Sequence, residues 1–162
     1  MDINVPMGEM KVAVNGDCLT SLGIGSCLVV TLYDSRLQNG GLAHTMLAGY
    51  RLSSKLQNPC EERRIENKEV KNTKFVDTAI DEMLKKLEAH GTKREDLGAK
   101  LIGGANMFAG LVSDIGQNNI ATAKEKLKKE KIKVIGEVVG GSKGRSVEFS
   151  TGTGIVTVKT KF

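Results

Sequence analysis

Two side chains in this sequence could together perform nucleophilic chemistry on a carbonyl group. Cys27 follows a short glycine-containing run at 23–26 and opens the apolar stretch 28–33. His44, one of only two histidines, lies in the next apolar segment along the chain. A free thiol is mostly protonated at neutral pH, so it becomes a good nucleophile when a neighbouring imidazole takes its proton. A thiol and an imidazole on consecutive strand-like segments therefore indicate thiolate chemistry.

The residues just before the thiol add a second element to this hypothesis. Gly25 and Ser26 precede Cys27, and glycine allows the backbone to approach a ligand closely. We expect backbone N–H groups of this loop, including that of Cys27, to hold a developing oxyanion. A third group usually orients the imidazole, and the nearby candidates are the hydroxyls of Thr20 and Ser21. The alternative is structural, since cysteine is among the most commonly buried residues.

Strands and two helices must position these residues. Apolar and β-branched runs between turn signals predict strands over 10–14, 18–22, 27–33, 42–47, 99–102, 133–139, 146–149 and 155–159. Apolar residues at three- and four-residue spacing predict a helix that starts near Phe75 and ends at Gly91. A second helix buries Ile120, Ala123 and Leu127, with Asn118 or Asn119 as its cap. The pattern predicts an α+β (or α/β) fold: one domain, 1–162, with a mixed β-sheet core and two amphipathic helices packed on it.

The register of one hairpin decides whether the thiol and the imidazole meet. Strands 27–33 and 42–47 are expected to pair as a hairpin. A turn centred on Ser35 and Arg36 would place Cys27 opposite His44, whereas a centre nearer Asn39 would require a bulge. The sequence leaves the two possibilities open.

Composition excludes several classes of protein. With no tryptophan and 4% aromatic residues, the chain does not suit a base-stacking nucleic-acid platform. Three cysteines without a C-x-x-C spacing favour neither a disulfide framework nor a zinc site, and no metal or organic cofactor is expected. No signal peptide or membrane-spanning run is visible, so we expect a cytoplasmic protein that is not inserted in a membrane. The net charge of +5 is concentrated at 124–133, either as a solvated helix face or as a patch that attracts an acidic partner.

Two further segments carry predictions. The stretch 51–74 is dense in charged residues and contains few apolar groups, so we expect a mobile loop. The run 103–108 (Gly-Gly-Ala-Asn-Met-Phe) either folds Met107 and Phe108 into the core or presents both to a partner protein. We favour the second interpretation and expect Phe108 to contribute more to partner binding than to stability.

The segments around Cys27, around His44 and at 103–108, together with two further blocks, resemble the CheD family of chemoreceptor glutamine deamidases. The similarity runs nearly end to end. Its most specific parts are Ser-Leu-Gly-Ile-Gly-Ser-Cys at 21–27, Gly-Gly-Leu-Ala-His-Thr-Met-Leu at 40–47, Phe-Val-Asp-Thr-Ala at 75–79, Gly-Gly-Ala-Asn-Met-Phe at 103–108, and the segment 140–148. The loop 51–74 is longer than is usual in the family, so nothing is transferred to it.

The resemblance implies a cytoplasmic hydrolase that converts glutamine side chains of chemoreceptor helices to glutamate and releases ammonia. It assigns the nucleophile to Cys27 and the catalytic histidine to His44. The third catalytic position, usually threonine, falls on Ser21, which keeps the hydroxyl but loses a methyl group, and a contribution from Thr20 stays open. Family members also bind the CheC phosphatase, through a segment similar to the one that contains Met107 and Phe108.

The mechanism that we expect has a thioester intermediate. The Cys27 thiolate attacks the carboxamide, His44 protonates the departing ammonia, and water then hydrolyses the thioester. Two alternatives remain: an adaptor that regulates a CheC-type phosphatase with little catalysis of its own, and a cysteine protease that uses the same pair.

Overall fold

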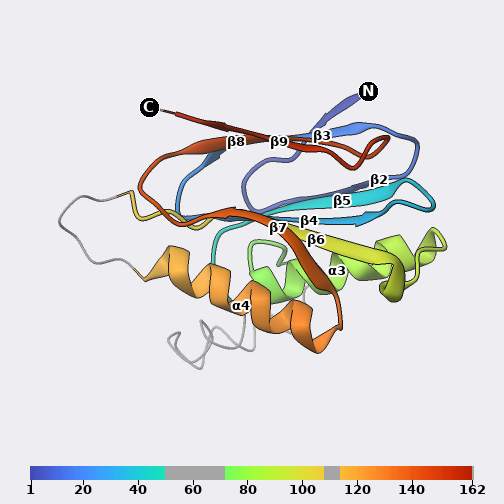
Figure 1. The fold of residues 1–162 in the computed structure, drawn as a ribbon. Helices are drawn as coiled ribbons and strands as arrows, with labels where there is room; N and C mark the ends of the chain where they lie inside the picture. The colour runs from blue at the N-terminus through green and yellow to red at the C-terminus, as the bar shows by residue number, and fades with distance from the viewer. Residues whose placement is uncertain (50–71, 108–113, 162) are drawn as a thin grey trace.

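The computed structural model describes residues 1–49, 72–107 and 114–161. Two β-sheets and two α-helices make up the described part (Figure 1). The four-stranded sheet has the order β1 (Asp2–Asn4), β3 (Cys18–Ile24), β8 (Arg145–Ser150), β9 (Val156–Thr160). The five-stranded sheet has the order β2 (Met10–Ala13), β5 (Asn39–Thr45), β4 (Leu28–Asp34), β6 (Leu97–Gly103), β7 (Lys133–Val139). The helices are α3 (Val76–Ala89) and α4 (Ile115–Lys129), and a short 3-10 helix spans Arg94–Asp96.

The sheets and helices form three layers. In Figure 1 the four-stranded sheet lies on top, the five-stranded sheet lies in the middle, and both helices cover the lower face of the middle sheet. The inner strands of the middle sheet are therefore covered on both faces. This explains why nearly every residue of β4 and β5 is buried, without the alternation of buried and exposed positions that a half-exposed strand shows.

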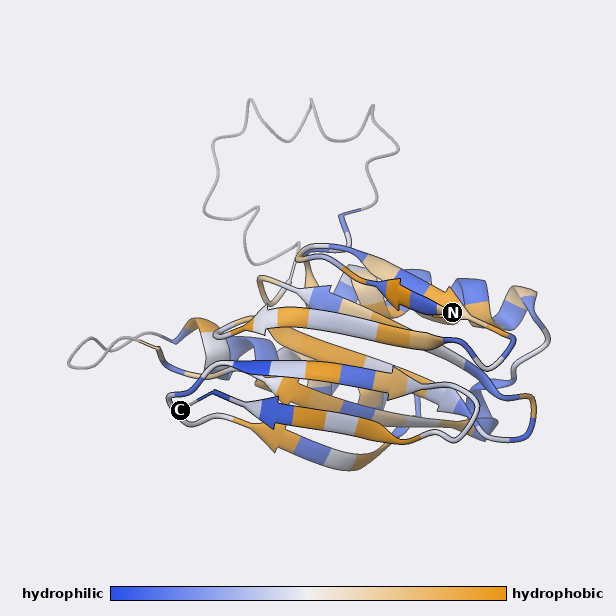
Figure 2. Ribbon diagram, turned by 90° about the horizontal axis from the view of Figure 1, so that it is seen from above, coloured by the Kyte–Doolittle hydropathy of each residue, from blue (hydrophilic) through white to orange (hydrophobic). Residues whose placement is uncertain are grey.

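Each interface between layers has its own apolar core. Between the middle sheet and the helices lie buried side chains such as Leu32, Ile80 and Leu101. Between the two sheets lie Leu19, Ile102 and Phe149, with further aliphatic side chains around them. The four-stranded sheet faces solvent with its other side, and Figure 2 shows the corresponding alternation of polar and apolar residues along its strands.

The fold class predicted from sequence is confirmed, with two differences in detail. The strands form two sheets rather than one, and both sheets are mixed because β1–β3 and β6–β7 pair in parallel. Strand β1 was not predicted, because three residues carry too little pattern. Strand β7 has the predicted bounds.

The helix ends were only partly predicted. Helix α3 ends before Gly91, which adopts a φ of +91°, as expected for a glycine after a helix. The prediction that Asn118 or Asn119 caps α4 is wrong: the helix begins at Ile115, after Asp114, and both asparagines lie inside it. Asn119 is fully buried.

Several predictions fall partly or wholly on residues outside the described ranges. The expected mobility of 51–74 concerns mainly residues 50–71, and the role of Phe108 concerns residues 108–113. At the described end of the first segment, the Thr73 hydroxyl donates a hydrogen bond to Gly8 O at 2.6 Å. Of the helices in the described ranges, neither is long and apolar enough to cross a membrane.

Candidate active site

The register of the β4–β5 hairpin sets where Cys27, the residue just before β4, lies relative to His44. Val29 pairs with His44 and Leu28 pairs with Thr45, so the turn is centred between Arg36 and Leu37. This is one residue beyond the centre that would place Cys27 directly opposite His44. Cys27, just before β4, thus becomes the diagonal neighbour of His44 rather than its direct partner. Diagonal positions in a ladder lie on the same face and within reach of larger side chains.

A bulge in β3 brings the chain from the upper sheet to the thiol. Ser21 pairs with Val147 and Ile24 pairs with Arg145, so β3 carries one residue more than β8 between these pairs. Residues three apart, such as Ser21 and Ile24, point to opposite faces in a regular strand. With the bulge, both side chains are fully buried. Gly23, with a φ of +68°, accommodates the bulge, and bulges of this kind often adjoin active sites.

Ser21 and His44 are joined by a hydrogen bond across the gap between the two sheets. Ser21 Oγ lies 2.7 Å from His44 Nδ1 and also donates to the carbonyl oxygen of Val5 at 2.7 Å. Thr20 occupies the neighbouring position of β3, is only half-buried, and makes no described contact with the imidazole. Of the two hydroxyls that the sequence offered, the structure brings Ser21 to His44.

These two hydrogen bonds fix the tautomer of the imidazole. A serine hydroxyl has one proton, and a backbone carbonyl can only accept, so the Ser21 proton is committed to Val5. His44 Nδ1 must then carry a proton and donate it to Ser21 Oγ. In the neutral ring, Nε2 consequently holds a lone pair. Among the described residues Nε2 has no hydrogen-bond partner, although it is buried.

Burial keeps both candidate catalytic groups neutral. It lowers the pKa of His44 below that of an ordinary histidine, because the charged imidazolium loses its hydration. Burial likewise raises the pKa of Cys27, an effect that the Cys27 backbone N–H opposes in part. The resting pair is therefore a thiol and a neutral imidazole, and the proton moves when the thiol attacks.

The loop that carries the thiol is anchored by three of its carbonyl groups. Gly25 O accepts a hydrogen bond from Ala105 N at 3.0 Å, and Cys27 O accepts one from Gly104 N at 2.8 Å. The carbonyl of Ser26 accepts one from the Asn119 side chain at 3.0 Å. Gly103 passes so close to Cys27 O that a side chain at that position would collide with it. The candidate oxyanion loop is thus held by the 103–107 turn and by α4.

Met107 lies over this loop and is partly exposed. Its side chain contacts Gly25, where an added Cβ would come within 3.1 Å of Met107 Cγ. It keeps 44% of its surface accessible. Met107 is therefore at the rim of the candidate site rather than in the core, and partner binding at this position stays a prediction.

Sequence reasoning missed two groups at the site. Val5 contributes only a backbone carbonyl, so no side-chain motif could reveal it. Asn119 was considered only as a helix cap, although it is the single polar residue within an otherwise apolar inward face of α4. That placement was the signal that could have identified it.

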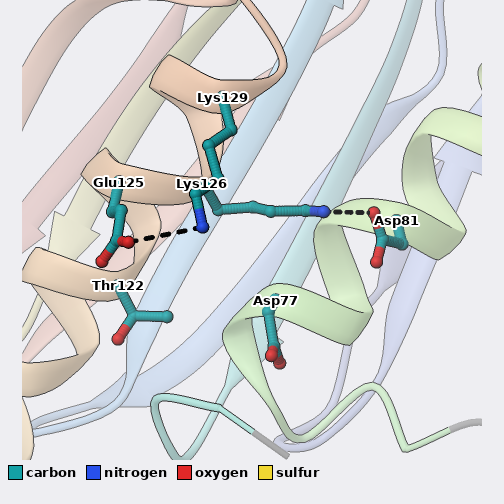
Figure 3. A pocket seen from close by; sticks show the side chains of 6 residues that line it. All are labelled: Asp77, Asp81, Thr122, Glu125, Lys126 and Lys129. Carbon is teal, nitrogen blue, oxygen red and sulfur yellow. Dashed lines mark ion pairs between the residues drawn. The ribbon is translucent and has the colours of Figure 1, made fainter.

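A charged pocket lies elsewhere in the described part of the molecule. It has a volume of about 380 Å³ and lies between α3 and α4, lined by Asp77, Asp81, Thr122, Glu125, Lys126 and Lys129 (Figure 3). Its lysines are ion-paired, Lys126 with Asp81 at 2.6 Å and Lys129 with Glu125 at 3.4 Å. It contains neither a thiol nor an imidazole, so we place the candidate chemistry at Cys27 and His44. Within the described ranges, no group of three or more His, Cys, Asp or Glu side chains is arranged to hold a metal ion.

Comparison with known proteins agrees with the resemblance seen in the sequence. The model of the family described as CheD chemotactic sensory transduction matches residues 59–160. A Clostridium botulinum protein named "Probable chemoreceptor glutamine deamidase CheD" is 38% identical over 98% of this chain and 93% of its own length. A Halalkalibacterium halodurans protein named "Chemoreceptor glutamine deamidase CheD" is 36% identical over the same shares. The chain belongs to the CheD family. The family model begins after Cys27 and His44, whereas the two relatives align with nearly the whole chain.

Proposed function

We propose that this protein is a chemoreceptor glutamine deamidase, a hydrolase that converts glutamine side chains to glutamate and releases ammonia. The names of its relatives support the reaction and the substrate class. The observation that carries the assignment of residues is the hydrogen-bonded series Val5 O, Ser21 Oγ, His44 Nδ1, which leaves a lone pair on Nε2. A neutral imidazole with a free Nε2 is the form needed to take a proton from a thiol.

The first half of the reaction forms a thioester. Cys27 Sγ bonds to the carboxamide carbon while its proton moves to His44 Nε2, and the π electrons of the carbonyl move to oxygen. The backbone N–H of Cys27 donates to this oxyanion. The oxyanion then collapses, the C–N bond breaks, and His44 gives its proton to the departing nitrogen, so that ammonia leaves. No net charge has been created at this stage, which suits a buried site.

The second half returns the enzyme to its starting state. His44 Nε2 takes a proton from water, and the resulting hydroxide adds to the thioester carbon. Collapse of the second tetrahedral intermediate breaks the C–S bond, and the thiolate regains its proton from the imidazolium. The products are glutamate and free enzyme. Ser21 keeps Nδ1 in the donor role throughout, so that the transferable proton is always at Nε2.

We also propose that the rim of the site binds a CheC-type phosphatase. The exposed part of Met107 lies beside the nucleophile loop, which is where a partner would affect access to Cys27. Phe108 belongs to the same proposal on sequence grounds. Its replacement by alanine is expected to weaken partner binding by at least roughly 30-fold, the effect of losing an aromatic anchor worth about 2 kcal/mol or more.

Intact-mass spectrometry of receptor cytoplasmic fragments tests the proposed reaction. Deamidation replaces NH₂ by OH, and this produces a small mass increase at each modified glutamine without shortening the chain. A cysteine protease would release fragments, and a pure adaptor would leave the mass unchanged. Either of these two results with freshly reduced protein would contradict the proposal.

A further inference from the structure

A buried asparagine connects helix α4 to the strands that carry the candidate catalytic pair. Asn119 Nδ2 donates to Ser26 O at 3.0 Å and to Met46 O at 3.2 Å. Ser26 directly precedes Cys27, and Met46 follows His44 by two residues. The side chain is fully buried, and among the described residues its Oδ1 has no partner. Burial of an amide in an apolar helix face costs free energy unless hydrogen bonds offset the loss of hydration, so the presence of Asn119 at this position needs an explanation.

The bond to Ser26 determines where the N–H of Cys27 points. The Ser26–Cys27 peptide is trans, and in a planar trans peptide the C=O and the N–H lie on opposite sides. Because Asn119 holds the Ser26 carbonyl toward α4, the Cys27 N–H must point away from the helix. The same N–H acts on its own thiol, where it partly offsets the burial that raises the pKa of Cys27. Because this N–H belongs to the same residue as the sulfur, it is close to the point where an attacked carbonyl would develop its negative charge.

The imidazole does not depend on Asn119 in the same way. His44 N donates to Glu9 O at 3.0 Å, His44 O accepts from Gly8 N at 2.8 Å, and the ring is held by Ser21. Loss of the Asn119 amide would leave these contacts in place. Its main consequence would be a freed Ser26 carbonyl, and with it a Cys27 N–H that is no longer fixed in direction.

We propose that Asn119 is a positioning residue that aims the Cys27 N–H at the oxyanion of the tetrahedral intermediate. The proposal rests on the deamidase function proposed above. Asn119 touches neither the substrate nor the reacting atoms in this account. It acts through the Ser26–Cys27 peptide, so its loss should affect reactions that form an oxyanion and spare reactions of the thiol that do not.

Two reactions of the same thiol separate this role from a general structural one. Deamidation of a receptor fragment forms an oxyanion, whereas alkylation of Cys27 by iodoacetamide displaces iodide and forms none. In Asn119→Ala we expect kcat for deamidation to fall about 100-fold with little change in KM, as for loss of one oxyanion donor. We expect the alkylation rate of Cys27, followed by site-resolved mass spectrometry, to stay within about threefold of the wild-type rate, since no oxyanion is involved.

The matched control is Asn118→Ala, which changes the neighbouring exposed asparagine of the same helix. It should leave both reactions unchanged. Undiminished deamidation by Asn119→Ala would overturn the proposal, and so would a parallel loss of deamidation and alkylation, which would indicate general support of the thiol. Wild-type protein without deamidase activity would instead overturn the proposed function and this inference with it.

A measurement on the wild-type protein covers the case in which Asn119→Ala does not fold. A glutamine-containing peptide whose side-chain carboxamide is replaced by an aldehyde should form a hemithioacetal with Cys27. The oxygen of this adduct occupies the position of the oxyanion. The NMR signal of the Cys27 amide proton should move downfield when the adduct forms, and an unchanged signal would show that this N–H is not the donor.

Discussion

Two polar regions of this protein, the groove between α3 and α4 and the candidate site around Cys27 and His44, differ in burial and in how far their polar groups are paired. The α3–α4 groove is highly charged, but its lysines are ion-paired, as in the contacts of Lys126 with Asp81 and Glu130. The site between the two sheets contains few polar atoms, and one of them, His44 Nε2, is buried without a described partner. Surface charges that already form ion pairs are poorly suited to act as a base or a nucleophile. An unpaired base beside a thiol can take a proton.

The comparison shows why we place the candidate site by burial and unmet hydrogen-bonding capacity rather than by pocket volume. Asp81 is 59% exposed, so water and dissolved salt screen its attraction to Lys126. Between the sheets, burial shifts the pKa of both Cys27 and His44 and holds the pair neutral. Variants in the two regions should therefore differ by orders of magnitude in their effect on activity.

The largest effect is expected from Cys27→Ala. The variant lacks the nucleophile, so deamidation of a receptor fragment should fall by about 10⁴-fold or more, as is usual when a covalent catalyst is removed. The thiol is only half-buried, so circular dichroism and the melting temperature should stay close to those of wild type. Cys18→Ala is the control and should remain active. If Cys27→Ala changed the mass of the receptor fragment at a near wild-type rate, Cys27 would not be the nucleophile.

His44→Gln should cost nearly as much. The amide keeps much of the volume of the ring but cannot move a proton, and general acid–base catalysis by a positioned side chain is worth about 10²–10⁴-fold. The double variant with Cys27→Ala should be no worse than Cys27→Ala alone, because the two groups act as one unit. Full activity of His44→Gln would mean that His44 is a structural histidine.

Ser21→Ala should have an intermediate effect. Without the hydroxyl, His44 Nδ1 loses its hydrogen-bond partner, and the imidazole is no longer held in one tautomer. Loss of a partner that orients a functional imidazole typically lowers activity by about 10- to 100-fold. Ser21→Thr should retain activity because it keeps the hydroxyl. Thr20→Ala should stay within about twofold of wild type, since Thr20 makes no described contact with the ring and other imidazole-orienting groups are untouched. A greater loss in Thr20→Ala than in Ser21→Ala would contradict this assignment.

The pH dependence follows from the lowered pKa of His44. The proposed mechanism requires neutral His44, so we expect kcat/KM to fall on acidification only below the pKa of an ordinary histidine. Stability follows the same sign: between the folded and unfolded pKa values the unfolded state binds more protons, so the free energy of unfolding decreases as the pH falls through this window. Melting temperatures of wild type and His44→Gln, measured against pH, should converge in acid. Parallel curves would show that His44 is not buried in its neutral form.

The smallest effect is expected in the helical groove. Lys126→Met removes the ion pairs with Asp81 and Glu130 but keeps the aliphatic stem. Its free energy of unfolding should change by at most about 1 kcal/mol, the usual range for partly exposed ion pairs. Deamidation should be unchanged. A large loss of activity, measured in the same mass assay, would show that the groove takes part in the reaction or in substrate binding.

Most of the local structure could be predicted from the sequence. The period of the apolar residues predicted α3 and the inward face of α4, and β-branched runs predicted eight of the nine strands in the described ranges. Helix capping failed at α4 because asparagine suits both a cap and a buried hydrogen-bonded position, and the local sequence does not distinguish them. The hairpin register depended on a turn whose centre lies one residue beyond the position that would have placed Cys27 opposite His44.

The sequence by itself indicated the candidate reactive groups: a thiol after a glycine loop, a histidine in the following strand, and two hydroxyls. Only the tertiary structure decided which hydroxyl meets the imidazole, because β3 and β5 belong to different sheets and the bulge after Ser21 sets the inward face. It also decided the partners of Asn119, which lie 93 and 73 residues away in the chain. Local patterns carry the period of each element, whereas contacts between layers depend on how those elements pack, which no short window of sequence contains.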